Sequence, residues 1–146
     1  MDEILVRTMT LACPVEHAFR TFTDKVDLWW PKGHRKHRDG SLRFDLVEGG
    51  DLVDRASDGD EWTMARITAL EPPARLDLEW YPGSPLAPTR VEIRFESAGA
   101  EATEITITHR ALTLETKSIW PQRVGLFTAG WDAVLPALNA FISTED

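Results

Sequence analysis

The chain has 146 residues, one cysteine and a net charge of −8 at pH 7. This length predicts one domain, residues 1–146, and the lone cysteine excludes an intrachain disulfide. The acidic balance disfavours nucleic acid as a partner, while an acidic N-terminus and the lack of an apolar run of about 20 residues predict a cytoplasmic protein with no signal peptide and no membrane partner.

The first part of the chain predicts one strand followed by two short helices. Residues 3–11 are rich in strand formers. Apolar side chains then recur at i, i+3, i+4 and i+7 over residues 15–22, which is typical of an amphipathic helix, and Pro14 suits its first position. Cys13 would lie at the start of this helix, a place that lowers the pKa of a thiol. Residues 24–30 predict the second helix, which ends before the next proline.

The middle of the chain predicts a meander of antiparallel strands. From residue 41 onwards apolar and polar residues alternate with a period of two, and turn sequences such as EGGD and SDGD separate the runs. The proline-marked stretch 81–88 predicts a loop within the domain. Four strands have clear bounds, at residues 61–70, 75–80, 90–96 and 103–110.

The last 25 residues return to helical spacing and carry one apolar stripe. Pro136 lies inside this stripe and predicts a kink, because proline lacks the N–H and clashes with the preceding turn. A sheet with one apolar face needs a cover, and this helix has the matching stripe. We therefore expect an α+β fold in which a sheet of about six or seven strands curls around a long C-terminal helix and leaves a cavity between them.

Five segments of the chain, in this order, resemble the START-like (SRPBCC) superfamily and, within it, the family named after the activator of the heat-shock-protein ATPase. They are ACPVEHAFRTFTD, WWP, ITALEPPARLDLEW, TEITITHRAL and GWDAVLPALNAF. The resemblance implies a helix-grip fold and, through the family name, a link to the stress response. Members of the superfamily include lipid and hormone binders, aromatic polyketide cyclases and dehydratases, and chaperone-associated modules. Because a fold does not fix a function, the lining of the cavity must decide between them.

His109 is the strongest candidate for chemistry. It shares the inner face of its strand with Ile105 and Ile107, so it must find a hydrogen-bond partner or titrate. It can contact a ligand or act as a general acid–base in a cyclase-like pocket. The alternative is a structural histidine bonded to a neighbour, which we favour because no paired base is evident.

The segment LWWPKGHRKHRD, residues 28–39, is rich in cations. His34 and His37 are spaced at i, i+3, but two ligands are too few for a zinc site, so we expect no metal. Arg35 and Arg38 are candidates to bind an anionic head group at the mouth of the cavity, although a solvated loop is the simpler interpretation.

Arg66 shares strand parity with Trp62 and Met64, which would turn it inward. If a bulge lies near Arg66, then Ile67 turns inward instead and the arginine is exposed. The pattern leaves both arrangements open.

We predict a binding domain for a small apolar or amphipathic molecule, with no cofactor, no metal and no catalytic residue, as a monomer or a homodimer. Two alternatives remain: an interaction module for a chaperone, and a cyclase- or dehydratase-like enzyme that uses His109. Trp29 and Trp30 are adjacent on a short helix, so we expect one inside and one near the surface or the cavity entrance. The residues expected to line the cavity or its mouth are Trp29, Trp30, Trp62, Met64, Arg66, Trp80, His109, Phe127 and Trp131.

Overall fold

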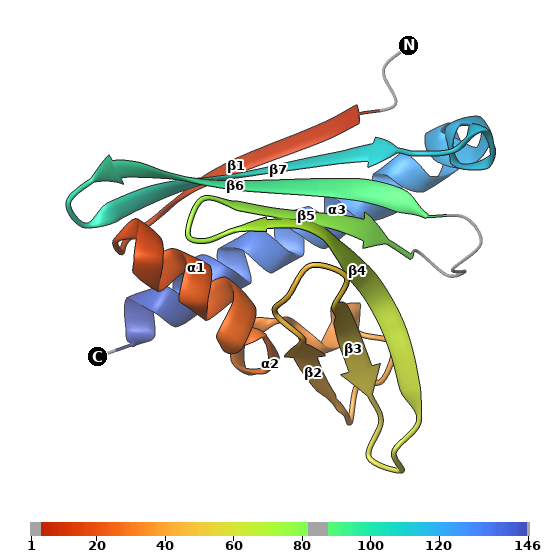
Figure 1. The fold of residues 1–146 in the computed structure, drawn as a ribbon, viewed down its shortest axis with the longest axis horizontal. Coiled ribbons are helices and arrows are strands. Elements are labelled where there is room, and N and C mark those ends of the chain that lie inside the picture. Colours follow the sequence, from red (N-terminus) through yellow and green to blue (C-terminus); the bar gives the residue numbers. More distant parts are fainter. Residues whose placement is uncertain (1–3, 82–87, 146) are drawn as a thin grey trace.

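A computed structural model describes residues 4–81 and 88–145, so most of the loop predicted at 81–88 lies outside the described residues. The chain runs through one strand, two helices and a 3₁₀ turn, then six strands and a long helix (Figure 1). The elements are β1 Ile4–Leu11, α1 Val15–Asp24, α2 Val26–Trp29, η1 Lys32–His34, β2 Ser41–Phe44, β3 Asp51–Arg55, β4 Glu61–Glu71, β5 Arg75–Trp80, β6 Thr89–Gly99, β7 Ala102–Ala111 and α3 Leu114–Thr144.

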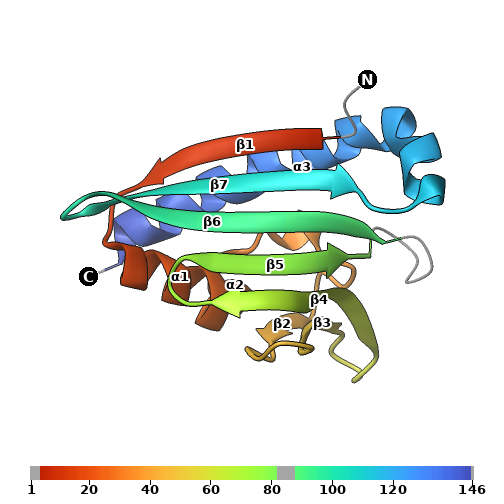
Figure 2. The ribbon, with the colours of Figure 1, turned by 45° about the horizontal axis from the view of Figure 1, so that its top comes forward.

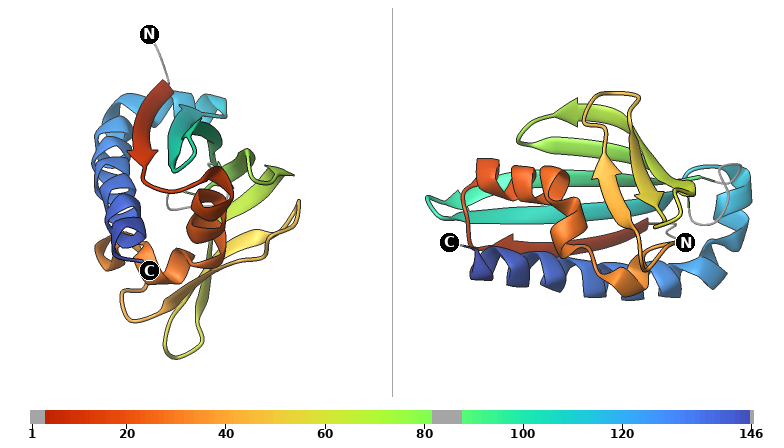
Figure 3. Two further views of the ribbon diagram at one scale, coloured as in Figure 1. Left: turned by 90° about the vertical axis from the view of Figure 1, so that its left-hand side faces the viewer. Right: turned by 90° about the horizontal axis from the view of Figure 1, so that it is seen from below.

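All seven strands form one antiparallel sheet in the order β1-β7-β6-β5-β4-β3-β2. The sheet bends at its β2–β4 end, where the register of β4 shifts against both neighbouring strands. Such bulges increase the local twist and curl a sheet. The views in Figure 3 show α3 along the concave side of this sheet, with α1 beside it. The predicted α+β helix-grip fold is confirmed.

The core lies between the concave face of the sheet, α1 and α3. The inward positions of the three central strands alternate with polar ones, as their sequences predict, and this inner set is almost completely buried. Its most buried members are Leu76, Leu78, Val91, Ile93, Phe95, Ile105 and Ile107, which meet Phe19 and Phe22 of α1 and Leu138 of α3 within one hydrophobic cluster.

Helix α3 begins eight residues earlier than the predicted stripe, at a capping box. The Thr113 hydroxyl accepts the N–H of Thr116, and the Thr116 hydroxyl accepts the N–H of Thr113. Figure 2 shows the first turns of α3 at an angle to its longer remainder, and the helix contains Pro121. Pro136 also lies inside the helix, and the kink predicted there stays a prediction.

By length and composition alone, α3 is apolar enough to cross a membrane, with a mean hydropathy of 1.2 over its most apolar window. From the sequence we expect no apolar run of this length. In the fold, the residues that raise the hydropathy include Val134, Leu135 and Leu138, which pack in the hydrophobic cluster. The helix is therefore the core helix of a soluble fold.

Candidate functional site

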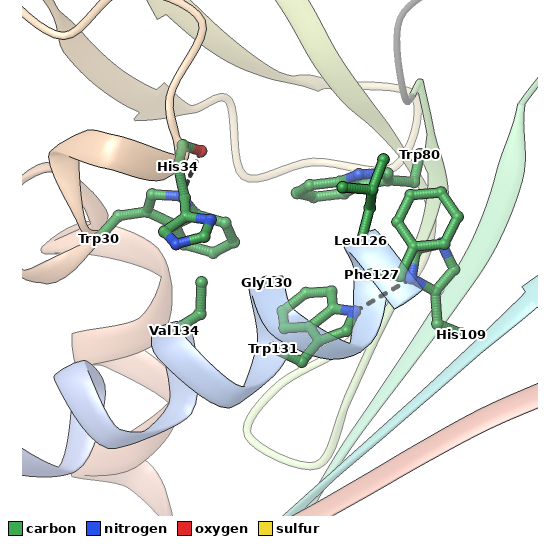
Figure 4. A pocket seen from close by; sticks show the side chains of 9 residues that line it. All are labelled: Trp30, His34, Trp80, His109, Leu126, Phe127, Gly130, Trp131 and Val134. Carbon is green, nitrogen blue, oxygen red and sulfur yellow. Dashed lines mark hydrogen bonds between the residues drawn. The ribbon is translucent and has the colours of Figure 1, made fainter. Parts of the chain in front are cut away.

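A pocket of about 150 Å³ lies between the sheet and the middle of α3 (Figure 4). The residues that line it come from the segment after α2, from η1, from β5 and β7, and from α3. They belong to Trp30, His34, Trp80, His109, Leu126, Phe127, Gly130, Trp131 and Val134. Both His34 and Leu126 are exposed, so the pocket opens to solvent on their side.

Three indole rings from separate elements form one wall of the pocket. The ring centroids of Trp30, Trp80 and Trp131 lie 5.8 to 6.0 Å apart, and the Trp30 ring is nearly perpendicular to that of Trp131. Aromatic pairs prefer such tilted and edge-to-face arrangements. Because β5, α3 and the segment after α2 each supply one ring, the wall exists only when all three elements are docked.

His109 is fully buried and both of its ring nitrogens are occupied. The indole N–H of Trp131 donates to Nδ1 over 3.0 Å, and Nε2 lies 2.7 Å from the Thr89 hydroxyl. Since an indole N–H can only donate, Nδ1 must be unprotonated and the proton of the neutral ring is on Nε2. The Thr89 hydroxyl is then free to donate to the carbonyl oxygen of Trp80, 3.3 Å away.

Burial lowers the pKa of His109 to about 3. The ring is therefore neutral at physiological pH, and the Phe127 ring packs on it with the centroids 4.3 Å apart. With no free nitrogen, His109 cannot take a proton from a ligand without breaking a buried hydrogen bond. Its geometry instead positions two members of the indole wall, the ring of Trp131 directly and the backbone of Trp80 through Thr89.

Arg35 does not face the pocket, contrary to the anion-binding hypothesis. Its side chain is 1% exposed and donates to Asp27 Oδ1 and to the carbonyl oxygen of Trp30, each over 2.7 Å. Although burial raises the pKa of Asp27, the hydrogen bonds from the N–H of Leu42 and from Arg35 lower it overall. This arginine holds α2, the Trp30 backbone and the following loop together.

His34 and His37 are held apart in the structure. His37 Nδ1 bonds to Asp54 over 2.8 Å, and its Nε2 lies 3.4 Å from Asp60. His34 instead lies at the mouth of the pocket, where its carbonyl oxygen accepts the indole N–H of Trp30 over 3.1 Å. Among the residues described, no group of three or more potential ligands is placed to hold a metal ion.

Five of the nine predicted site residues line the pocket: Trp30, Trp80, His109, Phe127 and Trp131. Trp29 and Trp62 do not. The indole of Trp29 is buried against Phe22 and donates to the carbonyl oxygen of Thr21 over 2.8 Å. Both adjacent tryptophans are buried, but Trp29 lies inside the core and Trp30 lines the pocket. Trp62 is half-buried, with the Lys36 ammonium 5.0 Å from its ring centroid.

Met64 and Arg66 also lie outside the pocket, because β4 carries a bulge. The register between β3 and β4 skips Met64, so the alternation reverses beyond it. Ile67 turns inward and is 1% exposed, whereas Arg66 points to solvent, 3.7 Å from Asp51. Of the two arrangements that the pattern left open, the structure has the bulged one.

Sequence reasoning missed four lining residues: His34, Leu126, Gly130 and Val134. Val134 is part of the apolar stripe of α3, and Leu126 and Gly130 directly precede Phe127 and Trp131 of that stripe. Helical spacing was therefore the available signal that these residues lie on or near the inner face of the helix. No signal distinguished His34 from the other basic residues of its loop.

The model of the family described as Activator of Hsp90 ATPase homolog 1-like protein matches residues 12–143. The chain belongs to this family. The match includes every residue that lines the pocket. Membership of the activator of Hsp90 ATPase homolog 1-like family agrees with the predicted resemblance and places the chain in the START-like superfamily. No curated protein matches the chain in sequence.

Solved structures share the fold of this family member. DynU16, a protein of the dynemicin biosynthetic locus, has a TM-score of 0.72 and 22% identity over 99% of this chain, which spans about half (48%) of DynU16. NE0264 from Nitrosomonas europaea has a TM-score of 0.70 and 18% identity over 98% of this chain and 96% of its own. Txn09, an anthrahydroquino-gamma-pyrone synthase complexed with SUM, has a TM-score of 0.57 and 27% identity over 73% of this chain and 75% of its own.

Proposed function

We propose that the chain binds a small, flat aromatic molecule in the pocket walled by Trp30, Trp80 and Trp131. The observation that carries this proposal is the meeting of three indoles from separate elements around an open pocket. Stacking on such rings favours planar apolar ligands. Because the nitrogens of His109 are already bonded, an apolar ring that enters breaks no hydrogen bond there.

The volume limits how much of a ligand is buried. Sites for drug-sized molecules begin at roughly 300 Å³, and an apolar cavity of about 150 Å³ is large enough for benzene. The pocket here has about 150 Å³. We therefore expect one or two fused rings to enter, while the rest of the ligand extends past Leu126 and His34 into solvent.

Membership of the family supports a ligand-binding domain in general terms. The name of Txn09, which describes a fused aromatic product, favours an aromatic ligand over an aliphatic one. The occupied nitrogens and neutral state of His109 favour binding over acid–base catalysis by that residue. A chaperone remains the alternative partner that the family name suggests, but the aromatic pocket argues for a small molecule.

Gly130 offers a direct test, because it lines the pocket and an added Cβ there meets no atom within 4 Å. Replacing Gly130 by Leu fills the pocket, so the affinity for 2-naphthamide, measured by calorimetry, should fall roughly tenfold or more. The variant should fold at least as stably as the natural chain, since Leu is a better helix former than Gly by about 0.8 kcal/mol.

Gly125 provides the matched control. It lies in the same helix, an added Cβ also meets no atom within 4 Å, and it does not line the pocket. The Gly125→Leu variant should bind 2-naphthamide like the natural chain. Equal binding by the Gly130→Leu and Gly125→Leu variants would refute the proposal, and so would a natural chain that binds no aromatic probe.

A further inference from the structure

We infer that the bound molecule is an aromatic acid, and that His34 binds its acidic group at the mouth of the pocket while the ring lies against the indoles. This inference rests on the proposed function. It concerns which end of the ligand faces solvent and which chemical class of ligand the pocket selects.

The polar groups among the lining side chains are the imidazoles of His34 and His109 and the indole N–H groups of the three tryptophans. The N–H groups of Trp30 and Trp131 already donate, to the carbonyl oxygen of His34 and to Nδ1 of His109. His109 is occupied on both nitrogens by Trp131 and Thr89, so it offers a ligand neither a donor nor an acceptor. The ring nitrogens of His34 make no hydrogen bond to any residue that the structure describes, and the side chain is exposed. His34 is therefore the exposed polar side chain of this lining, and its ring N–H is open to a ligand at the mouth of the pocket.

The position of His34 is fixed by its backbone. Its carbonyl oxygen accepts the indole N–H of Trp30, and Arg35, the next residue, is tied to Asp27 and to the carbonyl oxygen of Trp30. Figure 4 shows His34 and Trp30 on one side of the view of the pocket and Leu126 and Trp80 on the other. The donor is thus held close to where a bound ring would end, which reduces the entropy lost on binding.

The charges around the mouth favour an anion, although the whole chain is acidic. No carboxylate lines the pocket. Asp27 is paired with Arg35, and Asp132, which follows Trp131, is paired with Arg7 over 2.8 Å. Lys32 is exposed in the same short turn as His34 and adds positive charge on this side.

An imidazole carries at least one N–H in either protonation state, so His34 can donate to a carboxylate oxygen throughout the neutral range. Hydrogen bonds to a charged acceptor are stronger than those to a neutral one. A ring with a carboxylate at one end satisfies both parts of the site, because its apolar end meets the indoles and the other apolar side chains of the lining and its acidic end meets the exposed donor. In this arrangement the basic segment 28–39 binds an anion through His34 and not through Arg35, which is buried.

The test compares 2-naphthoate with 2-naphthamide, which has the same shape without the charge, by calorimetry on the natural chain and two variants. The natural chain should bind the carboxylate roughly fivefold more tightly than the amide. His34→Ala should bring this ratio close to one and leave the affinity for the amide within about twofold. Lys36→Ala should keep the ratio, since Lys36 lies over Trp62 and not at the pocket.

Each outcome decides between the two proposals. A natural chain that binds both probes equally, or a His34→Ala variant that retains the preference, overturns the role of His34 but leaves aromatic binding intact. If the natural chain binds neither probe, the proposed function itself fails, and the inference fails with it. A His34→Ala variant that loses both probes, with an unchanged melting temperature, shows that His34 packs against the ring and overturns its role as an anion donor.

Discussion

His109 shows what a single side chain contributes to the pocket. It links β7 to α3 through Trp131 and to the end of β5 through Thr89 and the Trp80 carbonyl. The inward position of His109 could be predicted from the alternation of its strand. Its partner could not, because Trp131 lies 22 residues away and their contact depends on how α3 is rotated on the sheet.

Replacing His109 by Phe keeps the ring shape but leaves the Trp131 N–H buried without an acceptor. We expect the free energy of unfolding at pH 7 to fall by about 2 kcal/mol. Adding Trp131→Phe should cost less than the sum of the two single changes, because the unsatisfied donor is then gone. Urea unfolding of the four proteins measures this coupling, and strict additivity would contradict the hydrogen bond.

The difference in stability between the natural chain and the His109→Phe variant should depend on pH. Because the pKa of His109 is lowered to about 3 in the folded chain, the unfolded chain binds the extra proton first as the pH falls below about 6.5. The folded natural chain therefore loses stability between pH 6.5 and 3 through this group, and the His109→Phe variant does not. The stability difference between them should shrink as the pH is lowered; a constant difference across this range would argue against a buried neutral ring.

The pKa of Cys13 is shifted in the direction opposite to the one predicted from the sequence. Its place at the start of α1 predicted a lowered pKa. Burial, with contributions from Glu145 and Glu101, instead raises the pKa of this thiol to about 11. The sequence shows the helix start, but it does not show that other elements cover it.

At the scale of elements, α2 and the loop after it depend on the buried guanidinium of Arg35. Removing Asp27 leaves this charge without its carboxylate, a type of change that costs 3–5 kcal/mol when both partners are buried. Since the Asp27 side chain is 42% exposed, we expect Asp27→Ala to lower the free energy of unfolding by about 2 kcal/mol.

Asp24 is a suitable control for this change, because it is exposed and close by in sequence. Asp24→Ala should change the stability by less than about 0.5 kcal/mol. If the two variants unfold at the same urea concentration, Arg35 does not hold the loop in the way described.

The first and last residues of the strands could be predicted from the sequence more reliably than which of their side chains point inward. The alternation and the turn residues of β5 to β7 are local signals, and these strands lie within a few residues of their predicted bounds. In β4 the bulge at Met64 carries no glycine or proline to mark it, so the outward direction of Arg66 depended on pairing with β3. The start of α3 was missed in the same way, because its capping box precedes the apolar stripe.

At the scale of the whole molecule, the order of periodicities was enough to predict the fold, since one apolar sheet face and one matching helix have few ways to pack. The size of the pocket and the position of His34 at its mouth could not be predicted in this way, because both depend on contacts between segments far apart in the chain. The predictions of a cytoplasmic location and of a monomer or homodimer stay predictions, while the soluble nature of the fold agrees with the family.

The central claim is that a small aromatic ring binds in the pocket against the wall formed by Trp30, Trp80 and Trp131. A crystal structure of the chain with 2-naphthoate tests this most directly. We expect the fused rings in the pocket, packed against the wall that these three indoles form, with the carboxylate toward His34. A structure from crystals grown with saturating 2-naphthoate in which the pocket is empty, or in which the molecule is bound elsewhere, would contradict it.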